Sequence, residues 1–494
     1  MARTGASSSQ RGILAQDEGA DCDETPMPVG VAVRECFRRA RARKQVGVKL
    51  EKAKMQVVSL FSGCGGMDLG FHQAGYSILR AVDNDPSAVA VYNGNFGGSS
   101  QVADVTEIDF SRWADEFGAI DGVLGGFPCQ GFSKAGPKRL DDPRNALYRA
   151  MHSAVQNLSP TFFVAENVEG LAQNFQGQML NKIREDFSQL GYAVNVALLD
   201  ASAFGVPQHR RRVVFVGIKD RSHAKDFRFP PPTHELRVRN GESKAPRALG
   251  SSIHGLEETL SSALAPPRTI CDGIGDLIEL DDSVADHFIS TKWPESYTHV
   301  MTSIAEGQKL CNVRHGHESV RTWDIPDAFG RTSASERHIL EIIARNRRHK
   351  KYGSTPNGNP LPIEVIENLA GESRLESTLV SLEKRGFLKR KGEGFDLLGA
   401  MFCSGLFKRP LWAEPSPTVL TNFGNPRYFF HPKVPRPFSL REAARLQGFP
   451  DDFEFLRNGI SLQDGYRLVG NAVPPPLARA IAGELQQQLW EPTK

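Results

Sequence analysis

The sequence predicts an α/β protein built around a doubly wound sheet. Short apolar runs with the length of buried strands alternate with helical segments from Met55 to Ile218. Several of these runs end in glycine or in a polar residue, as strands do at the edge of a sheet that binds a ligand. At 494 residues, the chain is long enough for one such domain with a large insertion.

Composition narrows the class of protein. The net charge is only +3, so contacts with nucleic acid would come from local basic patches. The seven cysteines contain no Cys-x-x-Cys pair, which argues against a disulfide framework or a zinc site and favours a reducing cytoplasm. No apolar run approaches the ~18 residues of a membrane span, and the N-terminus has no signal-peptide core. We therefore expect a cytoplasmic protein with no metal and no membrane contact.

Residues 1–54 are predicted to form a disordered N-terminal extension that is basic in its second half. The basic part, Val31–Lys54, fits a solvated helix as well as a segment that follows a phosphate backbone.

Glycines and aspartates follow the first three predicted strands. The strand Met55–Phe61 leads into the turn SGCGGMDLGF, whose glycines allow a close approach of the backbone to a ligand, although the turn lacks the GxGxxG pattern. The strand Ser77–Val82 ends at Asp83, 17 residues after Gly66, where such folds hold a ribose hydroxyl. Asp104 follows a third strand. Each aspartate alone is typical of a cap or turn, but together with the glycines they predict a nucleoside-binding edge.

A fourth strand, Gly122–Leu124, runs into the loop GGFPCQGFS and presents Cys129 at the carboxyl end of the strand. Pro128 stiffens this loop because its ring fixes one backbone angle. Cys129 is a candidate nucleophile, although a lone cysteine in an apolar sequence is more often a small core residue. The next strand, Thr161–Val164, runs into Glu166-Asn167-Val168.

The sheet pattern continues as far as residue 218. The remaining predicted elements are the helices Asn145–Asn157 and Gln178–Leu190, and the strands Tyr192–Leu199 and Val213–Ile218, with QHRRR just before the last strand.

Between Lys219 and Arg436 the regular alternation stops. Within this insertion, the stretch 334–398 predicts a winged helix-turn-helix, either a DNA binder or an interaction module. Its expected elements are helices at Arg337–Asn346, Ile363–Ala370 and Ser373–Arg385, and a hairpin that turns at Gly392–Gly394.

Helical signals return after Pro437. Ser439 and Glu442 have the spacing of a capping box, and Gly448 ends the helix that they begin. Three prolines then precede the closing helix, Leu477–Leu489.

Six dispersed motifs resemble those of the bacterial DNA cytosine-5 methyltransferases of restriction-modification systems, and they stand in the family's order. They are SLFSGCGGMDLGF, GGFPCQGFS, ENV, QHRRR, REAARLQGFPDDF and GNAVPPPLARAIA. The resemblance implies an S-adenosylmethionine-dependent methyltransferase sheet of the Rossmann-like kind. It assigns 55–218 to the catalytic domain, 219–436 to a target-recognition region with the winged-helix-like module, and 437–494 to a return into the catalytic domain.

The resemblance also implies a reaction, in which a methyl group passes from S-adenosyl-L-methionine to C5 of a cytosine flipped out of a specific duplex sequence. Cys129 would attack C6 and form a covalent adduct, because C5 is otherwise a poor nucleophile. Glu166 would donate a proton or hydrogen bond to N3. Arg212 would contact O2 with Arg210 in support, and His209 takes no role.

Further contacts follow from the same resemblance. The predicted cofactor-binding residues are Phe61, Ser62, Gly63, Cys64, Gly65, Gly66, Asp83, Asn84, Asp104, Val105, Asn471 and Val473. The predicted substrate-binding residues are Pro128, Gln130, Ser133 and Asn167. Asn84 departs from the family, since many relatives stack an aromatic residue on the adenine at that position.

Three alternatives to this function differ in substrate or class. A tRNA cytosine-5 methyltransferase would keep the chemistry, but the RNA-modifying relative lacks a large recognition insertion. A non-catalytic DNA-binding regulator is disfavoured by the intact motifs, and a nicotinamide oxidoreductase by the absent GxGxxG. The expected partner is double-stranded DNA, bound by a monomer at the bacterial nucleoid, with a cognate restriction endonuclease acting separately.

Overall fold

The computed structural model describes residues 55–128, 147–173, 177–219, 227–236, 247–248, 264–289, 293–314, 316–355, 358–399 and 403–490. The predicted N-terminal extension lies outside these ranges, as do Cys129, Gln130 and Ser133. None of the helices in the described part of the chain combines the length and the apolar character that a bilayer crossing requires.

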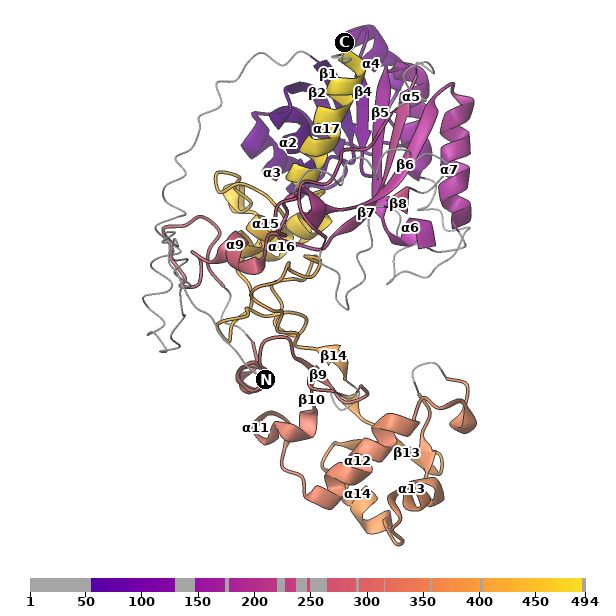
Figure 1. Ribbon diagram of the computed structural model, residues 1–494, viewed down its shortest axis with the longest axis vertical. Coiled ribbons are helices and arrows are strands. Elements are labelled where there is room, and N and C mark those ends of the chain that lie inside the picture. Colours follow the sequence, from indigo (N-terminus) through magenta and orange to yellow (C-terminus); the bar gives the residue numbers. More distant parts are fainter. Residues whose placement is uncertain are drawn as a thin grey trace, which may run out of the picture. The chain divides into compact units, whose positions relative to one another are not determined.

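An eight-stranded sheet forms the core of the first part of the chain (Figure 1). Its strand order is β3-β2-β1-β4-β5-β7-β6-β8, and β7 runs antiparallel to both of its neighbours. The strands are β1 (Met55–Leu60), β2 (Tyr76–Asp83), β3 (Ser100–Val102), β4 (Gly122–Gly125), β5 (Phe162–Val168), β6 (Ala193–Asp200), β7 (Arg211–Ile218) and β8 (Arg247–Ala248).

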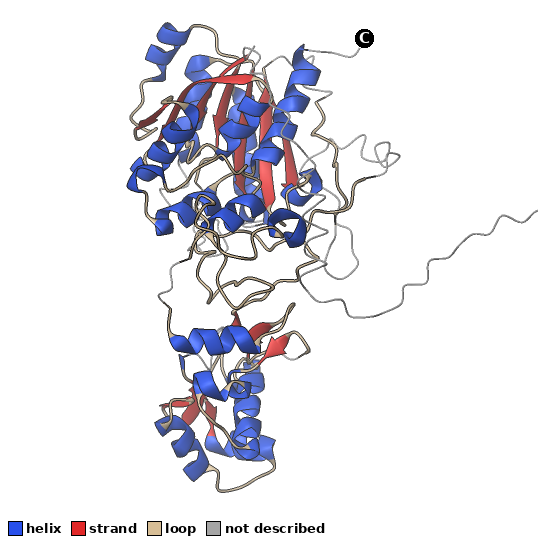
Figure 2. Cartoon of the chain, turned by 90° about the vertical axis from the view of Figure 1, so that its left-hand side faces the viewer, coloured by secondary structure: helices blue, strands red, loops and turns tan. Residues whose placement is uncertain are grey.

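Helices cover both faces of this sheet, so the predicted doubly wound α/β fold is confirmed (Figures 1 and 2). Successive strand residues point to opposite faces: Val58 packs into one hydrophobic core and Val57 into the other. The core around Val58 includes α4 (Phe110–Phe117), α5 (Tyr148–Leu158) and α7 (Gln178–Gln189). The core around Val57 includes α2 (Gly66–Gln73) and α17 (Pro475–Trp490). The C-terminal helix therefore packs on the same face of the sheet as the first helix.

The strand order reverses beside β1. The chain first builds β2 and β3 on one side of β1 and then places β4 on the other side, with Leu60 in register with Gly125. The loops that leave β1 and β4 therefore lie next to each other, at the kind of position where open α/β sheets bind ligands. These loops carry the glycine turn and the residues that lead to Cys129.

The reversed direction of β7 has a consequence for the predicted arginine motif. In an antiparallel pair the beginning of one strand lies beside the end of the other, and Arg212 is in register with Val168. The start of β7 therefore lies beside the carboxyl end of β5, which carries Glu166.

The C-terminal part contains one helix that the sequence did not predict. α15 (Leu440–Leu446) begins with the expected capping box of Ser439, and Gly448 follows it with φ 90°. The additional helix is α16 (Leu462–Asn471). Glycine usually weakens a helix, but Gly470 allows a close contact between α16 and the insertion. An added Cβ at this position would lie 2.4 Å from the amide nitrogen of Thr421.

The insertion begins with short elements that show no sequence periodicity. A small three-stranded sheet has the order β10-β9-β14, with β9 (Lys309–Cys311) at its centre, β10 (Ser319–Val320) and β14 (Ser404–Leu406). The helices α10 (Glu295–Ser303) and α11 (Pro326–Phe329) share a hydrophobic core with this sheet, whereas α9 (Ile270–Ile274) packs against α15.

Between β10 and β14, the chain forms a module with the connectivity of a winged helix. A helix, a strand, two helices and two strands follow one another, and the sheet order is β11-β13-β12. The module has its own hydrophobic core, and Arg347 pairs with Asp396 inside it at 2.6 Å. Its elements are α12 (Ala334–Asn346), β11 (Leu361–Pro362), α13 (Ile363–Ala370), α14 (Glu376–Lys384), β12 (Leu388–Lys391) and β13 (Gly394–Leu397).

Two basic side chains of the third helix and the hairpin contact other residues of this module. Arg385 pairs with Glu336 at 2.5 Å. Arg390 lies 3.7 Å from Glu383 and 4.6 Å from the ring centre of Phe395. The third helix and its hairpin therefore present less unpaired positive charge than the sequence suggests.

Candidate active site

The glycine turn after β1 is held by the end of β2. The amide of Ser62 donates to the carbonyl of Val82 at 3.0 Å, and the amide of Gly63 donates to Oδ2 of Asp83 at 2.8 Å. Gly63 and Gly65 have φ values of 55° and 93°, which glycine adopts without strain. The structure thus brings together the predicted turn and the predicted carboxylate.

Asp83 is half-buried, and burial is the main cause that raises the pKa of its carboxyl group. Its Oδ1 accepts the amide of Asp85 at 2.9 Å. Each carboxylate oxygen offers about two lone-pair sites, so each still has room for a hydroxyl donor. Asp85 in turn forms an ion pair with Arg467 of α16.

The C-terminal motif reaches the same turn. A Cβ added to Gly66 would lie 2.3 Å from the carbonyl oxygen of Val473 and 3.1 Å from the Cβ of Ala472. The Sγ of Cys64 lies 3.7 Å from the carbonyl oxygen of Leu468, and burial raises the pKa of this thiol to about 12. Cys64 is therefore a packed thiol at neutral pH.

Replacing Gly66 with alanine is expected to lower both stability and cofactor affinity. The new methyl group would push against the backbone of Val473, and overpacking of this kind costs about 1–3 kcal/mol. Thermal unfolding and calorimetric titration with S-adenosylmethionine measure the two effects. Gly483→Ala in α17 is the control, because a Cβ there meets nothing within 4 Å and removing a helical glycine gains roughly 0.5–1 kcal/mol. Equal melting temperatures for the two variants would contradict this packing argument.

The other predicted cofactor residues lie around the turn with differing exposure. Phe61 is half-buried with φ 54° and packs against the core, and Val105 is buried. Asp104 is exposed, and its Oδ1 accepts the amide of Thr106 at 2.9 Å. Asn84 and Asn471 are both exposed.

A carboxylate and a guanidinium group face each other between β5 and β7. Oε1 of Glu166 lies 2.7 Å from Nε of Arg212, with the two side chains only 12% and 11% exposed. Nη1 of Arg212 also donates to the carbonyl of Arg211 at 2.9 Å. The ENV and QHRRR motifs assigned these two residues to the same base, and the structure places their side chains side by side.

The loop after β4 comes close to this pair. A Cβ added to Gly126 would lie 3.5 Å from Oε2 of Glu166. Nδ2 of Asn167 donates to the carbonyl of Phe127 at 2.9 Å, so this predicted substrate contact holds the loop. Pro128 is the last described residue before Cys129.

Unlike Arg212, which pairs with Glu166, Arg210 binds backbone carbonyl groups. Its side chain is buried, and it donates from Nη1 to the carbonyl of Val419 at 3.1 Å and from Nη2 to the carbonyl of Gly470 at 2.9 Å. It therefore joins the start of β7 to the end of the insertion and to the C-terminal motif. These contacts are those of a positioning residue.

Gln208 is a junction that the sequence analysis did not identify. Its Oε1 accepts the amide of Val419 at 2.7 Å, and its Nε2 donates to Oε1 of Gln447 at 2.6 Å. Gln447 also donates to the carbonyl of Ala472 at 2.6 Å. Both glutamines stand inside matched motifs, and their burial is the property that local sequence does not reveal.

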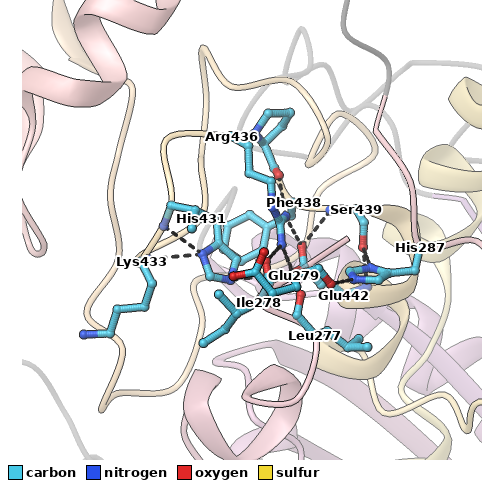
Figure 3. A network of polar contacts seen from close by, with 12 residues as sticks. Leu277, Ile278, Glu279, His287, His431, Lys433, Arg436, Phe438, Ser439 and Glu442 are labelled. Carbon is cyan, nitrogen blue, oxygen red and sulfur yellow. Dashed lines mark hydrogen bonds and ion pairs between the residues drawn. The ribbon is translucent and has the colours of Figure 1, made fainter. Parts of the chain in front are cut away.

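A buried polar network fixes α15, the helix that ends just before Gln447 (Figure 3). Glu442 of α15 accepts two hydrogen bonds from Arg436, at 2.8 and 2.7 Å, and one from the amide of Ser439 at 2.7 Å. Nδ1 of His287 lies 2.8 Å from the Ser439 hydroxyl. Nδ1 of His431 accepts the amide of Lys433 at 3.1 Å. The network ties α15 to two segments of the insertion.

Acid is expected to weaken the fold through His431. Burial, followed by the charge of Arg436, lowers its pKa from 6.5 to about 2. Between these values the unfolded chain takes up a proton that the folded chain excludes. The free energy of unfolding should therefore fall by up to about 1.4 kcal/mol for each pH unit below 6.5.

Denaturant unfolding at pH 6.5 and 5.5 measures this loss. His431→Asn keeps an acceptor for the Lys433 amide but does not titrate, so its stability should depend less on pH. His338→Asn, on the exposed side of α12, is the matched control. An unchanged pH dependence in His431→Asn would exclude His431 as the cause.

Comparison with known proteins decides the family. The model of the C-5 cytosine-specific DNA methylases matches residues 55–487. The chain belongs to this family. The motif order thus identified the family correctly, and the chain is a DNA cytosine-5 methyltransferase by membership.

Its relatives come from restriction-modification systems. The type II methyltransferase M.AgeI of Thalassovita gelatinovora is 31% identical over 450 residues, which cover 87% of this chain and 98% of that protein. The type II methyltransferase M.DdeI of Desulfomicrobium norvegicum is 30% identical over 437 residues, covering 87% and 88%. Among solved structures, the S. pombe Dnmt2 methyltransferase has a TM-score of 0.43 at 17% identity, covering 88% of this chain and 100% of its own.

Proposed function

We propose that this protein transfers a methyl group from S-adenosyl-L-methionine to C5 of a cytosine flipped out of a specific duplex DNA sequence. The observation that carries the proposal is the Glu166–Arg212 pair, 2.7 Å apart, with the loop toward Cys129 against the carboxylate. A carboxyl group and a guanidinium group side by side match the N3 and O2 edge of cytosine.

The residues around the glycine turn fit the cofactor. A Cβ at Gly63 would meet nothing within 4 Å, so the turn is open above this residue. Asp83 would accept hydrogen bonds from the ribose hydroxyls, as carboxylates do at the end of the second strand of related sheets. The family resemblance assigns Asp104 to the adenine amine and Phe61 to its ring. When bound, the cofactor supplies an electrophilic methyl group.

Cys129 is proposed as the nucleophile. A thiolate that attacks C6 forms a C–S bond and moves electron density to C5, which then accepts the methyl group. A free cysteine with a pKa of about 8.5 is only partly ionised at neutral pH, so the site must favour the thiolate. Arg212 faces the Glu166 carboxylate against which Gly126 of this loop lies, and we propose that it contributes positive charge for this. Asn167 fixes Phe127, two residues before Cys129.

Glu166 and Arg212 are proposed to hold the flipped base. A proton or hydrogen bond from Glu166 to N3 withdraws electrons from C6, and Arg212 donates to O2. Arg210 supports Arg212 through its bonds to the Val419 and Gly470 carbonyls. Loss of the C5 proton then lets Cys129 leave and restores the aromatic ring.

The remaining parts of the chain are assigned by position. Residues 219–436 take the target-recognition role, because the catalytic centre would accept any cytosine and sequence choice needs groove contacts made elsewhere. Gln130 and Ser133 are proposed contacts to the DNA. A cognate restriction endonuclease would cut the same sequence when it is unmethylated.

Bisulfite sequencing of DNA from cells that express the protein tests this function directly. Methylation of one cytosine within a fixed sequence is the expected result. A parallel assay with labelled cofactor compares duplex DNA with tRNA in vitro. Label in tRNA alone would overturn the choice of substrate.

A further inference from the structure

A cavity of about 430 Å³ opens in the insertion beside the small sheet of β9 and β14. Its frame is held by backbone hydrogen bonds: the Gly307 amide donates to the Arg409 carbonyl at 2.8 Å, and the Arg409 amide donates to the Gln308 carbonyl at 2.9 Å. Its lining residues are Gly307, Gln308, Lys309, Arg314, Gly405, Lys408, Arg409, Pro410, Pro417 and Phe429.

Positive charge dominates this lining. Four of the lining residues are lysine or arginine and none of them is acidic, in a chain whose net charge is only +3. The ammonium group of Lys408 lies 4.9 Å from the ring centre of Phe429. Partial burial, then the like charges of Lys309 and Arg314, lower the pKa of Lys408. Such a concentration of like charge favours a bound anion.

The polar groups of the lining suit phosphate better than a base edge. Gln308 carries the only side-chain amide among the lining residues, and both ends of it are engaged: Oε1 accepts the Ala305 amide at 2.9 Å and Nε2 donates to the His317 carbonyl at 2.8 Å. Arg409 donates to the carbonyl of Ile304 at 2.8 Å and so belongs to the frame. Lys309 forms an ion pair with Glu318 at 3.2 Å. The exposed Arg314 and the ammonium group of Lys408 suit phosphate, which proteins commonly contact through such side chains.

One wall of the cavity continues into the candidate active site. Pro417 lines the cavity, and the next residue, Thr418, donates from Oγ1 to the carbonyl of His209 at 2.7 Å. Val419 accepts Nη1 of Arg210. Two residues of chain span at most about 7 Å. Because a duplex presents a phosphate about every 1.7 Å of its axis, DNA bound at the Glu166 site would present several phosphates on either side of the flipped base.

We propose that this cavity binds backbone phosphates of the DNA duplex beside the flipped cytosine, through Arg314 and Lys408. The inference rests on the proposed function, and it adds a site at which the duplex is gripped independently of its sequence. The cavity would hold the register of the DNA while other contacts in the insertion read the bases.

The double variant Lys408→Gln, Arg314→Gln tests the proposal in the full-length protein. Each lost phosphate contact lowers the slope of log K against log salt by about 0.9, so the slope should fall by about 1.8. Affinity should fall roughly 10-fold or more at 0.15 M salt, equally for target and unrelated duplexes. Fluorescence anisotropy over a range of salt concentrations measures both quantities. The single variant Arg314→Gln should lower the slope by about 0.9. Because Arg314 is exposed, this variant should fold normally, so the proposal can still be tested if the double variant misfolds.

Matched variants separate phosphate binding from other causes. Arg112→Gln, Lys182→Gln removes the same charge from α4 and α7, and the slope should stay that of the wild type. Lys408→Arg should retain the slope as well. An unchanged slope in the cavity variant, an equal fall in the α4 and α7 control, or a loss confined to the target sequence would each overturn the proposal.

The wild-type protein distinguishes this result from a failure of the proposed function. If the wild type methylates duplex DNA and the cavity variant keeps its slope, the cavity assignment is wrong and the function stands. If the wild type binds DNA without methylating it and the variant still loses slope, the cavity assignment stands and the function is wrong.

Discussion

Replacing Cys129 with alanine is expected to abolish methyl transfer while S-adenosylmethionine still binds with nearly normal affinity. The thiol attacks the cytosine and not the cofactor, so its loss removes the covalent step and leaves the glycine turn unchanged. Removal of a catalytic nucleophile lowers turnover by about 10⁴–10⁶-fold. Label transfer to duplex DNA measures the rate, and calorimetric titration measures cofactor binding.

A duplex with 5-fluorocytosine at the target position provides a second readout. Fluorine does not leave as a proton does, so wild-type protein should remain covalently attached to this DNA, whereas Cys129→Ala should not. Cys271→Ala, a half-buried thiol in α9, is the matched control and should keep both activity and adduct. Methylation by Cys129→Ala, or the absence of an adduct on a proven target site, would disprove the covalent mechanism.

The strands β1 to β7 and several of the helices could be predicted because they follow from local patterns. β4 is a continuous apolar run before two glycines, and α7 ends where Gly191 adopts φ 91°. α13 begins and ends at the predicted residues, Ile363 and Ala370. The helix α16 was missed because Gly465 and Gly470 resemble breakers in sequence, while in three dimensions they make room for neighbouring residues.

The candidate site could be predicted only in part, since its residue types are local but its contacts are not. The family resemblance assigned Glu166 and Arg212 to one base, and their side chains lie next to each other in the structure. The partners of Arg210 lie more than 200 residues away, at Val419 and Gly470, and no local pattern predicts such pairs. Gln208 was missed for the same reason.

Surface charge was the least predictable property. From sequence alone, any basic residue is a candidate for binding DNA. In the structure, however, Arg385 is paired with Glu336, and Arg390 lies near Glu383 and Phe395. The cavity cations Lys309 and Lys408 are almost 100 residues apart in the chain, and only the pairing of β9 with β14 brings their segments together. Charge clustering of this kind depends on the fold.

Glu166→Gln is expected to lower turnover by about 10²–10⁴-fold with little change in stability, because the amide keeps the shape but does not deliver a proton to N3. Its side-chain oxygen still faces Nε of Arg212, so the guanidinium group keeps a neutral partner. The adduct with 5-fluorocytosine DNA should form more slowly, since attack by Cys129 depends on withdrawal of electrons from C6. Saturating both substrates in the rate assay separates this effect from weaker binding.

The neighbouring Glu169 provides the control that distinguishes chemistry from local charge. It pairs with Arg211 at 2.8 Å, one residue from Arg212, and Glu169→Gln removes the same charge from the same end of β5. If the proton on Glu166 drives the reaction, Glu169→Gln should retain turnover within a few-fold, while Glu166→Gln stays slow at every pH from about 6 to 8. Equal losses in both variants would point to the local field, and a wild-type rate in Glu166→Gln would remove Glu166 from the acid role and leave Arg212 as the main contact to the base.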